Sequence, residues 1–313
     1  MYKNKRVIVT GGAGFIGSHL AEELSRRGNK VVVVDDLSTG RMGNMELLLK
    51  TGDIEFVRGS IMDLALLQEL FQGTDYVFHQ AAIPSVPRSI ENPPASHEAN
   101  ITGTLNVLMA ARDNGIKKVI YALSSSVYGD TPTLPKKEDM PPNPQSPYAV
   151  TKVASEYYCR IFHQIYGLPT VCLRYFNVYG PRQDPDSQYA AVIPRFIQRV
   201  LRNQPPVIFG DGEQTRDFTF IKDVVEANIL AAESDATGVF NIGGGEKISI
   251  NQLAKLIIGL AGSSIEPVHQ KPMPGDIRHS LADISRARSF GYNPRHSLEK
   301  GLKETSRVTN SNP

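Results

Sequence analysis

The sequence predicts an α/β protein with a doubly wound parallel sheet, followed by a smaller C-terminal α/β lobe. Three observations support this fold class. Short runs of β-branched residues alternate with longer helical patterns through the first half of the chain, as in a parallel sheet covered by helices on both faces. The first run leads through a glycine-rich turn into a helical pattern. The second half is dense in proline and glycine, which predicts many loops.

The elements are expected in a defined order. In the first half we expect strands at Arg6–Thr10, Lys30–Val34, Glu55–Val57, Tyr76–His79, Lys118–Leu123 and Thr170–Tyr175, and helices at Phe15–Arg27, Ile101–Asn114 and Val153–Tyr166. In the second half we expect helices at Val192–Arg202, Val224–Ser234 and Ile250–Ala261, and a frayed tail over residues 306–313. We expect residues 1–176 to form a dinucleotide-binding (Rossmann) domain and residues 177–313 a smaller lobe, some segments of which return to the first domain.

Composition argues against several classes of function. The chain has 34 Lys and Arg against 32 Asp and Glu among 313 residues, so it lacks the bulk positive charge of a general nucleic-acid-binding protein. No apolar stretch is long enough to span a membrane, and no signal peptide is expected. Cys159 and Cys172 have no metal-ligand spacing and are interpreted as reduced core thiols. We therefore expect a cytoplasmic protein without a metal site.

The first strand runs into a loop with glycines at positions 11, 14 and 17. Gly11 permits a tight turn, Gly14 lets a pyrophosphate approach the backbone, and Gly17 lets helix and strand pack closely. Phe15 and Ile16 open the helix, whose N-terminus favours an anion. The second strand ends in Asp35-Asp36. An acid there accepts hydrogen bonds from ribose hydroxyls and repels a 2′-phosphate, which favours NAD over NADP.

A tyrosine and a lysine lie four residues apart at the start of a predicted helix, as Tyr148 and Lys152 after Pro147. Such a pair shares one helical face, and an ammonium near a phenol lowers the phenol pKa, which makes the tyrosine a usable base. Alone the pair is more often a surface contact. A second element supports catalysis, because Ser124-Ser125-Ser126 follows the fifth strand, where ligands bind in doubly wound sheets.

Together these motifs resemble the extended short-chain dehydrogenase/reductase family, over about residues 6–301. The resemblance implies that Tyr148 is the base, that Lys152 binds the nicotinamide ribose, and that Ser124, or else Ser125, completes the triad. Asn100 resembles the family's structural asparagine near the cofactor. The expected NAD site also includes Ser38, Thr39, Gly40, Ser60, Ile61, Gln80, Ala81, Ala82 and Tyr175.

One position departs from the family pattern. After the third strand the family usually has an aspartate that meets adenine, whereas this chain has Ser60 between Gly59 and Ile61. Asp63 could replace it only in a different register. A serine can accept one hydrogen bond but carries no charge, so the adenine contact differs from the family pattern, and NAD binding stays the expectation.

Further segments resemble the family's nucleotide-sugar site. Asn177 would bind the diphosphate, and Val192 and Ile193 would lie beside the uracil. Arg216 and Arg278 would pair phosphate oxygens, because guanidinium binds them in a bidentate manner. The expected substrate site is completed by Ser85, Ser126, Phe209 and Ser285, together with Ser124, Ser125 and Tyr148.

The reaction type is inferred from side chains that are missing. Dehydratases and many decarboxylases of the family carry carboxylates in the loop that here reads Ser125-Ser126. What remains is 4-epimerisation of a UDP-hexose: hydride removal at C4, rotation of the 4-keto sugar, and hydride return. A nucleotide-sugar dehydratase, decarboxylase or reductase, and a non-catalytic NAD-sensing protein, are the alternatives.

The sugar is expected to be N-acetylated. The loop around Ser85 resembles that of UDP-N-acetylglucosamine 4-epimerases, and a small residue at Ser285 would leave room for an N-acetyl group. We therefore expect UDP-GlcNAc/UDP-GalNAc, with UDP-Glc/UDP-Gal as possible further substrates and UDP-glucuronate as the alternative. By the same resemblance, the helices near residues 101–114 and 148–166 imply a homodimer.

Overall fold

The computed structural model describes residues 3–50, 54–185, 191–272 and 277–310. Its centre is a seven-stranded sheet in the order β3-β2-β1-β4-β5-β6-β11, and every neighbouring pair is parallel. The strands are β1 (Arg6–Thr10), β2 (Lys30–Asp35), β3 (Ile54–Arg58), β4 (Tyr76–His79), β5 (Lys118–Ser124), β6 (Thr170–Tyr175) and β11 (Gly238–Ile242). This doubly wound sheet confirms the predicted fold class and all six expected strands.

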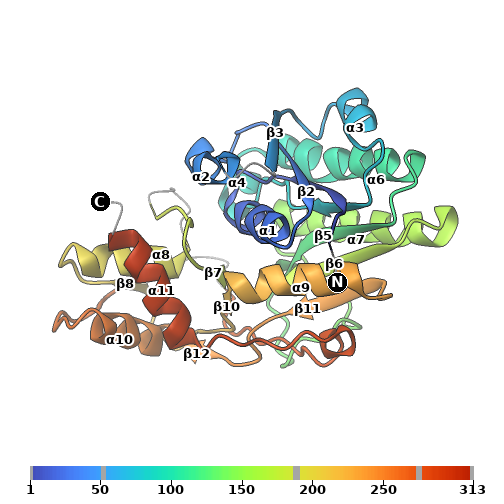
Figure 1. Ribbon diagram of the computed structural model, residues 1–313. Helices are drawn as coiled ribbons and strands as arrows, with labels where there is room; N and C mark the ends of the chain where they lie inside the picture. The colour runs from blue at the N-terminus through green and yellow to red at the C-terminus, as the bar shows by residue number, and fades with distance from the viewer. Residues whose placement is uncertain (1–2, 51–53, 186–190, 273–276, 311–313) are drawn as a thin grey trace.

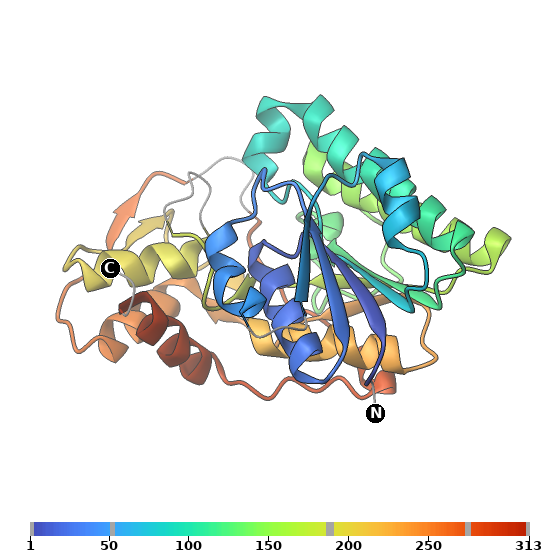
Figure 2. The same cartoon turned by 45° about the horizontal axis from the view of Figure 1, so that its top comes forward.

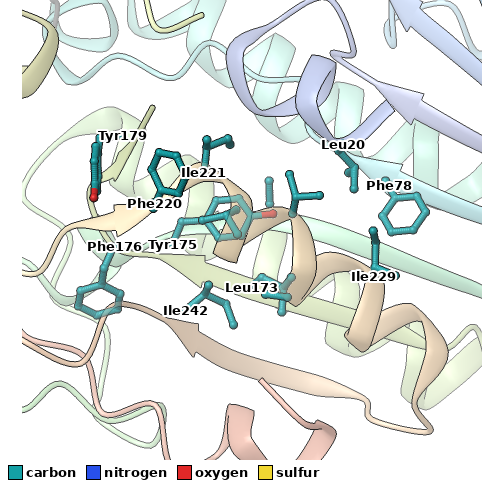
Figure 3. Close-up of a cluster of buried hydrophobic side chains, with 14 of the residues drawn as sticks. Leu20, Phe78, Leu173, Tyr175, Phe176, Tyr179, Phe220, Ile221, Ile229 and Ile242 are labelled. Atoms are coloured by element: carbon teal, nitrogen blue, oxygen red, sulfur yellow. The ribbon is translucent and has the colours of Figure 1, made fainter. Parts of the chain in front are cut away.

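Helices cover both faces of the sheet (Figure 1). On one face α1 (Phe15–Arg26) packs against α9 (Ile221–Glu233), and on the other α3 (Leu64–Leu70), α6 (Gly103–Asp113) and α7 (Pro147–Tyr166) pack together. The valines of β2 explain this arrangement, because alternate side chains of a strand point to opposite faces. Val31 and Val33 join one buried cluster, and Val32 and Val34 join the other. Figure 3 shows part of the first cluster, with side chains from α1, from α9 and from the sheet strands β4, β6 and β11 among those labelled.

The start of α7 is fixed by local sequence. The Ser146 hydroxyl accepts a hydrogen bond from the Ala149 N–H at 3.2 Å, and Pro147 occupies the first turn. A serine N-cap followed by proline is a strong helix start. Gly167 ends the helix in the left-handed region at φ 69°, a conformation that glycine adopts most readily. The helix therefore presents Tyr148 and Lys152 from its first turn and a half.

The second half builds a loop-rich lobe to one side of the sheet (Figures 1 and 2). Its helices are α8 (Val192–Leu201), α10 (Ile250–Leu260) and α11 (Leu298–Asn310). Its short strands pair as β7 (Val178–Tyr179) with β10 (Thr219–Phe220), β8 (Val207–Phe209) with β13 (Val268–Gln270), and β9 (Thr215–Arg216) with β12 (Ile248–Ser249). The remaining short helices are η1 (Met42–Asn44), α2 (Glu46–Leu49), α4 (Val86–Glu91), α5 (Pro93–His97), the π-helix η2 (Glu98–Thr102), η3 (Ser125–Tyr128) and η4 (Ala287–Phe290).

Two features differ from the sequence-based expectations. The tail expected from residue 306 is helical as far as Asn310, because α11 buries Leu302 and Thr305 against the lobe; residues 311–313 lie outside the described part. Strand β11, which was not among the expected strands, adds a seventh strand to the central sheet. It and the covering helix α9 come from the second half of the chain, from which some segments were expected to return to the first domain. The division at residue 176 stays a prediction. Cys159 and Cys172 are buried and free, as expected.

Among the described residues, no helix is both long and apolar enough to cross a membrane.

Candidate active site

A cavity of about 640 Å³ opens at the carboxyl ends of the sheet strands. It lies where the chain order reverses, because β1 is followed outward by β2 and β3, whereas its other neighbour β4 continues to β5 and β6. Ligands of doubly wound folds bind at this switch point. The loops after β1 and β4 touch there, since a Cβ at Gly11 would lie 2.6 Å from the Ala81 Cα.

The glycine loop after β1 has the expected geometry. Gly11 has φ 70°, and a Cβ at Gly17 would lie only 2.2 Å from the Gly11 carbonyl oxygen. Helix α1 begins after Gly14 without a side-chain cap, so its N-terminal end is open to an anion. Gly11, Gly14, Phe15, Ile16 and Gly17 all line the cavity. These residues fit the pyrophosphate of a dinucleotide.

The two acids that follow β2 have different surroundings. Asp35 is buried, and its carboxylate accepts hydrogen bonds from the Ala13 N–H at 3.0 Å and the Leu37 N–H at 2.8 Å; burial raises its pKa. Asp36 is exposed and accepts the Ser38 N–H at 2.9 Å. Both line the cavity with Ser38 and Thr39. Gly40 stays outside the lining and packs on Asp35, because a Cβ there would lie 2.6 Å from the carboxylate.

The loop after β3 lines the far end of the cavity through Ser60, Ile61 and Met62. The Ser60 hydroxyl accepts the Met62 N–H at 3.3 Å. Asp63 caps α3 by accepting the Leu66 N–H at 3.0 Å, and it does not line the cavity. Ser60 therefore occupies the position where the family pattern has an acid.

Tyr148 and Lys152 both line the cavity. Lys152 is 3% exposed, and its Nζ donates to the Ala122 carbonyl at 2.9 Å and to the Tyr121 hydroxyl at 3.2 Å. Burial lowers the pKa of Lys152 to about 8. Burial also raises the pKa of Tyr148 to about 12, although a hydrogen bond with Ser124 acts to lower the Tyr148 pKa. The expected lowering by Lys152 does not appear here, because its Nζ is turned to Ala122, 5.9 Å from the centre of the Tyr148 ring.

The three serines play different parts. Ser124 ends β5, accepts the Ser126 N–H at 3.1 Å, and is the serine whose side chain pairs with Tyr148. Ser125 opens η3. The Ser126 hydroxyl oxygen is buried and has no partner among the described residues. None of the three is part of the cavity lining, but Ala122, Leu123 and Tyr148 beside them are.

Asn100 lies under the loop that follows β4. It is fully buried, accepts the Ile83 N–H at 2.8 Å, and donates to the Thr151 hydroxyl at 3.0 Å. It thus connects the loop to α7 without reaching the cavity. Three residues of this loop, Gln80, Ala81 and Ala82, line the cavity with Tyr175. The Tyr175 hydroxyl receives a hydrogen bond from Asn228 at 2.8 Å.

The two arginines that are expected to bind phosphate lie on neighbouring segments of the second lobe. The Thr215 N–H donates to the Arg278 carbonyl at 3.0 Å, so Arg216 and Arg278 come from adjacent segments. Arg278 forms a bidentate pair with Asp211 at 2.8 Å, which lowers the pKa of Asp211 to about 2. Asn177 donates to the Asp217 carbonyl at 2.8 Å. These residues lie outside the cavity lining, as do Val192 and Ile193 at the start of α8 and Phe209 at the end of β8.

The serines expected at the sugar differ in burial. Ser85 lines the cavity and caps α4 by accepting the Arg88 N–H at 3.2 Å. Ser285 is exposed, and its N–H donates to Asp283 at 2.9 Å, so the structure does not bring it to the cavity or to these arginines. Ser280 is 8% exposed, and its N–H donates to the Thr215 carbonyl at 3.1 Å, beside Arg216. Ser280 is not among the residues expected from the sequence.

A segment over the cavity was also missed. Arg182, Gln183 and Asp184 line it. The segment is held on α1, because His19 donates to the Pro181 carbonyl at 2.9 Å and Arg182 pairs with Glu22 at 2.6 Å. Burial lowers the pKa of His19 to about 4. Asp184 pairs with Arg41 from the loop after β2.

Within the described parts of the chain, no group of three His, Cys, Asp or Glu side chains could hold a metal ion.

Comparison with known proteins gives consistent matches. Residues 7–243 match the model of the NAD dependent epimerase/dehydratase family. The structure resembles the UDP-N-acetylglucosamine 4-epimerase of Methanobrevibacter ruminantium M1, with a TM-score of 0.96, 45% identity and 99% coverage of both chains. It also resembles the UDP-glucose 4-epimerase of Thermus thermophilus in complex with NAD, at a TM-score of 0.89, 36% identity, and coverage of 98% of this chain and 100% of that one. A UDP-N-acetyl-α-D-glucosaminuronate decarboxylase of Bacillus cytotoxicus is 41% identical, over 96% of each chain.

Proposed function

The chain belongs to the NAD-dependent epimerase/dehydratase family, and on that premise we propose that it is a UDP-hexose 4-epimerase with UDP-N-acetylglucosamine as its main substrate. The glycine loop would hold the NAD pyrophosphate, Asp35 or Asp36 the adenosine ribose, and Lys152 the nicotinamide ribose. When bound, NAD would supply the acceptor and the donor of the C4 hydride. Every other task falls to the side chains of the protein.

Tyr148 takes the proton of the sugar O4 hydroxyl as the C4 hydride leaves, and gives it back when the hydride returns to the other face. Both the proton and the hydride therefore return, and the enzyme ends each cycle unchanged. The Ser124 hydroxyl supports this role, because its hydrogen bond lowers the Tyr148 pKa against the effect of burial. Lys152 is fixed nearby, because its Nζ donates to the Ala122 carbonyl.

The observation that carries the reaction type is the pairing of Tyr148 with a serine loop that lacks carboxylates. Eliminating water from a hexose needs an additional acid and base, and Ser125 and Ser126 supply neither. The acids that line the cavity come from other segments: Asp35 and Asp36 follow β2, Glu98 is on η2, and Asp184 is paired with Arg41. Because a decarboxylase is as similar in sequence as the epimerases, overall identity does not separate the two reactions. The proposal of an epimerase therefore rests on the missing carboxylates of the serine loop.

The N-acetylated substrate is supported by small serines at the sugar end of the site. Ser85 lines the cavity. Ser285 was the expected neighbour of the sugar C2 substituent, but it is exposed. We therefore give that role to Ser280, which is buried beside Arg216, because the Thr215 carbonyl accepts its N–H. Like Ser285, Ser280 lies outside the cavity lining.

The test is to incubate the purified protein, without added NAD, with UDP-GlcNAc, UDP-Glc and UDP-glucuronate in separate reactions. We expect UDP-GalNAc of unchanged mass from the first, separated by anion-exchange chromatography. Loss of water or carbon dioxide from any substrate would instead identify a dehydratase or decarboxylase. Preferred turnover of UDP-glucuronate would overturn the substrate, and no turnover of any of them would favour a non-catalytic NAD-binding protein.

A matched pair of variants tests the sugar contact. Ser280→Tyr is expected to reduce kcat/KM for UDP-GlcNAc by at least about tenfold relative to UDP-Glc, because a bulky ring fills the space for the acetyl group. Ser285→Tyr places the same ring on the exposed surface and serves as the control. The opposite result, selectivity lost only in the Ser285 variant, would restore Ser285 to this role.

We further propose that the protein forms a homodimer through α7. This helix exposes an apolar stripe, with Val150 51%, Tyr157 44%, Ile161 39% and Ile165 67% exposed. Seven- and four-residue spacings place these side chains on one helical face. A two-fold contact would cover the same stripe on both copies, and an uncovered stripe of this kind marks an interaction site.

A further inference from the structure

A buried polar cluster lies behind the serine loop and has no part in the proposed chemistry. It consists of Tyr128, Arg174, Glu156 and Asn241. Tyr128 is 1% exposed, Arg174 2% and Asn241 0%. A buried guanidinium is unfavourable unless its charge is paired and its donors are satisfied. The charge and the hydrogen-bond donors of Arg174 must therefore be paired within the cluster. The contacts of its members indicate its role.

Arg174, near the end of β6, is the centre of the cluster. Its Nε and Nη2 donate to the two carboxylate oxygens of Glu156 at 3.0 and 2.7 Å. Its Nη1 donates to the Tyr128 hydroxyl at 2.7 Å, and that hydroxyl donates to the Asn241 side-chain oxygen at 2.7 Å. The Asn241 amide group in turn donates to the Lys136 carbonyl at 2.8 Å. The four side chains thus form one continuous chain of short, partly charge-assisted bonds.

The cluster joins the two elements that carry the proposed reaction. Tyr128 is the last residue of η3, the short helix that follows Ser124. Glu156 is on α7, about two turns beyond Tyr148. The bonds through Arg174 therefore fix the far end of the serine loop to the helix that presents the base. Ser124 itself lies between the end of β5 and this loop.

We propose that Tyr128 is a positioning residue: with Arg174 and Glu156 it sets the distance between the Ser124 hydroxyl and the Tyr148 phenol. This inference rests on the proposed 4-epimerase activity. Hydrogen bonds are lost over a few tenths of an ångström, and a misplacement of about 1 Å can reduce a rate by about 100-fold. Removing the Tyr128 hydroxyl leaves Asn241 Oδ1 without its donor and Arg174 Nη1 with only the long bond to the Glu138 carbonyl at 3.3 Å.

The test is Tyr128→Phe, which removes one buried oxygen. We expect kcat for UDP-GlcNAc to fall at least about tenfold with KM changed less than about twofold, because the two arginines expected to bind phosphate are elsewhere. We also expect the acid limb of the kcat–pH profile to move to higher pH. Ser124 lowers the Tyr148 pKa, so a displaced Ser124 leaves that pKa higher. The titratable groups facing Tyr148, Lys152 on α7 and Tyr121 on β5, are unchanged in the variant.

Tyr292→Phe is the matched control. Tyr292 is also 1% exposed, and its hydroxyl donates to the Gly243 carbonyl at 2.8 Å, away from the serine loop. The midpoint temperature of thermal unfolding should fall by a similar amount in both variants, whereas only Tyr128→Phe should alter kcat and the pH profile. Equal kinetic effects in the two variants, or wild-type kcat and pH profile in Tyr128→Phe, would overturn the proposal.

A second variant approaches the cluster from α7. Glu156→Gln keeps the size of the side chain, removes the charge that pairs Arg174, and should change kcat and the acid limb in the same direction; wild-type kinetics there would also count against the proposal. If the wild-type protein converts no UDP-hexose, the proposed function fails. Hydrogen exchange of residues 124–128 then decides the positioning role, with faster exchange expected in Tyr128→Phe than in Tyr292→Phe.

Discussion

Gly17→Ala is expected to abolish NAD binding while leaving the protein folded. The added Cβ would lie 2.2 Å from the Gly11 carbonyl oxygen and 2.7 Å from the Gly12 Cα. Ordinary contact begins at 3.4 Å, so the overlap with the oxygen is 3.4 − 2.2 = 1.2 Å. Both neighbours are backbone atoms and cannot rotate away. The loop must therefore move by roughly 1 Å, at a cost of about 1–3 kcal/mol of stability, as for other overpacked sites.

The effect on the cofactor follows from the same displacement. Backbone N–H groups that bind a pyrophosphate at about 2.9 Å lose their bonds when they move by about 1 Å. Hydrogen bonds to charged groups contribute about 1.5–3 kcal/mol each. Losing two of them costs about 3–6 kcal/mol, which weakens NAD binding by at least about 100-fold.

The measurement is thermal unfolding of NAD-free protein with and without NAD. A ligand at 100 times its Kd stabilises the folded state by about 2.7 kcal/mol, so the wild-type protein should show a clear upward shift that Gly17→Ala lacks at the same concentration. Gly259→Ala is the control, because a Cβ on this α10 residue meets nothing within 4 Å and alanine stabilises a helix interior. An NAD-dependent shift of wild-type size in Gly17→Ala would refute the reasoning.

Three further results are expected. Tyr148→Phe should lower kcat by about 10²–10⁴-fold while keeping the NAD-dependent shift in unfolding temperature; substantial residual activity would remove the tyrosine as base. Burial raises the pKa of Asp217 from 3.8 to about 6. The folded carboxyl thus keeps its proton to a higher pH than the unfolded one, and its contribution to stability is present below about pH 4 and falls by about 3 kcal/mol as pH rises to about 6. Denaturant titrations at several pH values should show that the free energy of unfolding of Asp217→Asn does not fall over this range. Curves of this free energy against pH that run parallel for the two proteins would contradict the expectation. Ile165→Lys should shift the protein from dimer to monomer in analytical ultracentrifugation, and an unchanged mass would argue against the α7 interface.

Local sequence was sufficient where the chemistry depends on neighbours along the chain. The glycine loop, Asp35 and Asp36, and the Tyr148/Lys152 pair lie within single turns, so their spacing determines their geometry. The alternating burial of the β2 valines likewise follows from the period of a strand. Together with the family resemblance, these features explain why six strands and half of the residues that line the cavity could be predicted.

Contacts between distant segments could not be predicted in the same way. Strand β11 contains Asn241, a polar residue that argues against a buried strand unless its partner Tyr128 is known. Ser280 and Ser285 are both small, and only the pairing of the Ser280 N–H with Thr215 distinguishes the buried one from the exposed one. The Lys152 ammonium group points away from Tyr148 because it donates to the Ala122 carbonyl on β5. The spacing of residues along α7 does not reveal this contact with another element.

The cavity lining has a consequence for the way the chain comes apart. Its walls include the glycine loop with the start of α1, the loop after β2, and the segment 178–184. The first two belong to the first half of the sequence and the third to the second half. A ligand that contacts both walls links them non-covalently. Opening either half alone then exposes the ligand's binding groups, so the stabilisation by the ligand resists partial unfolding as well as complete unfolding. Binding of a ligand at this site is therefore expected to make the unfolding of the two lobes cooperative.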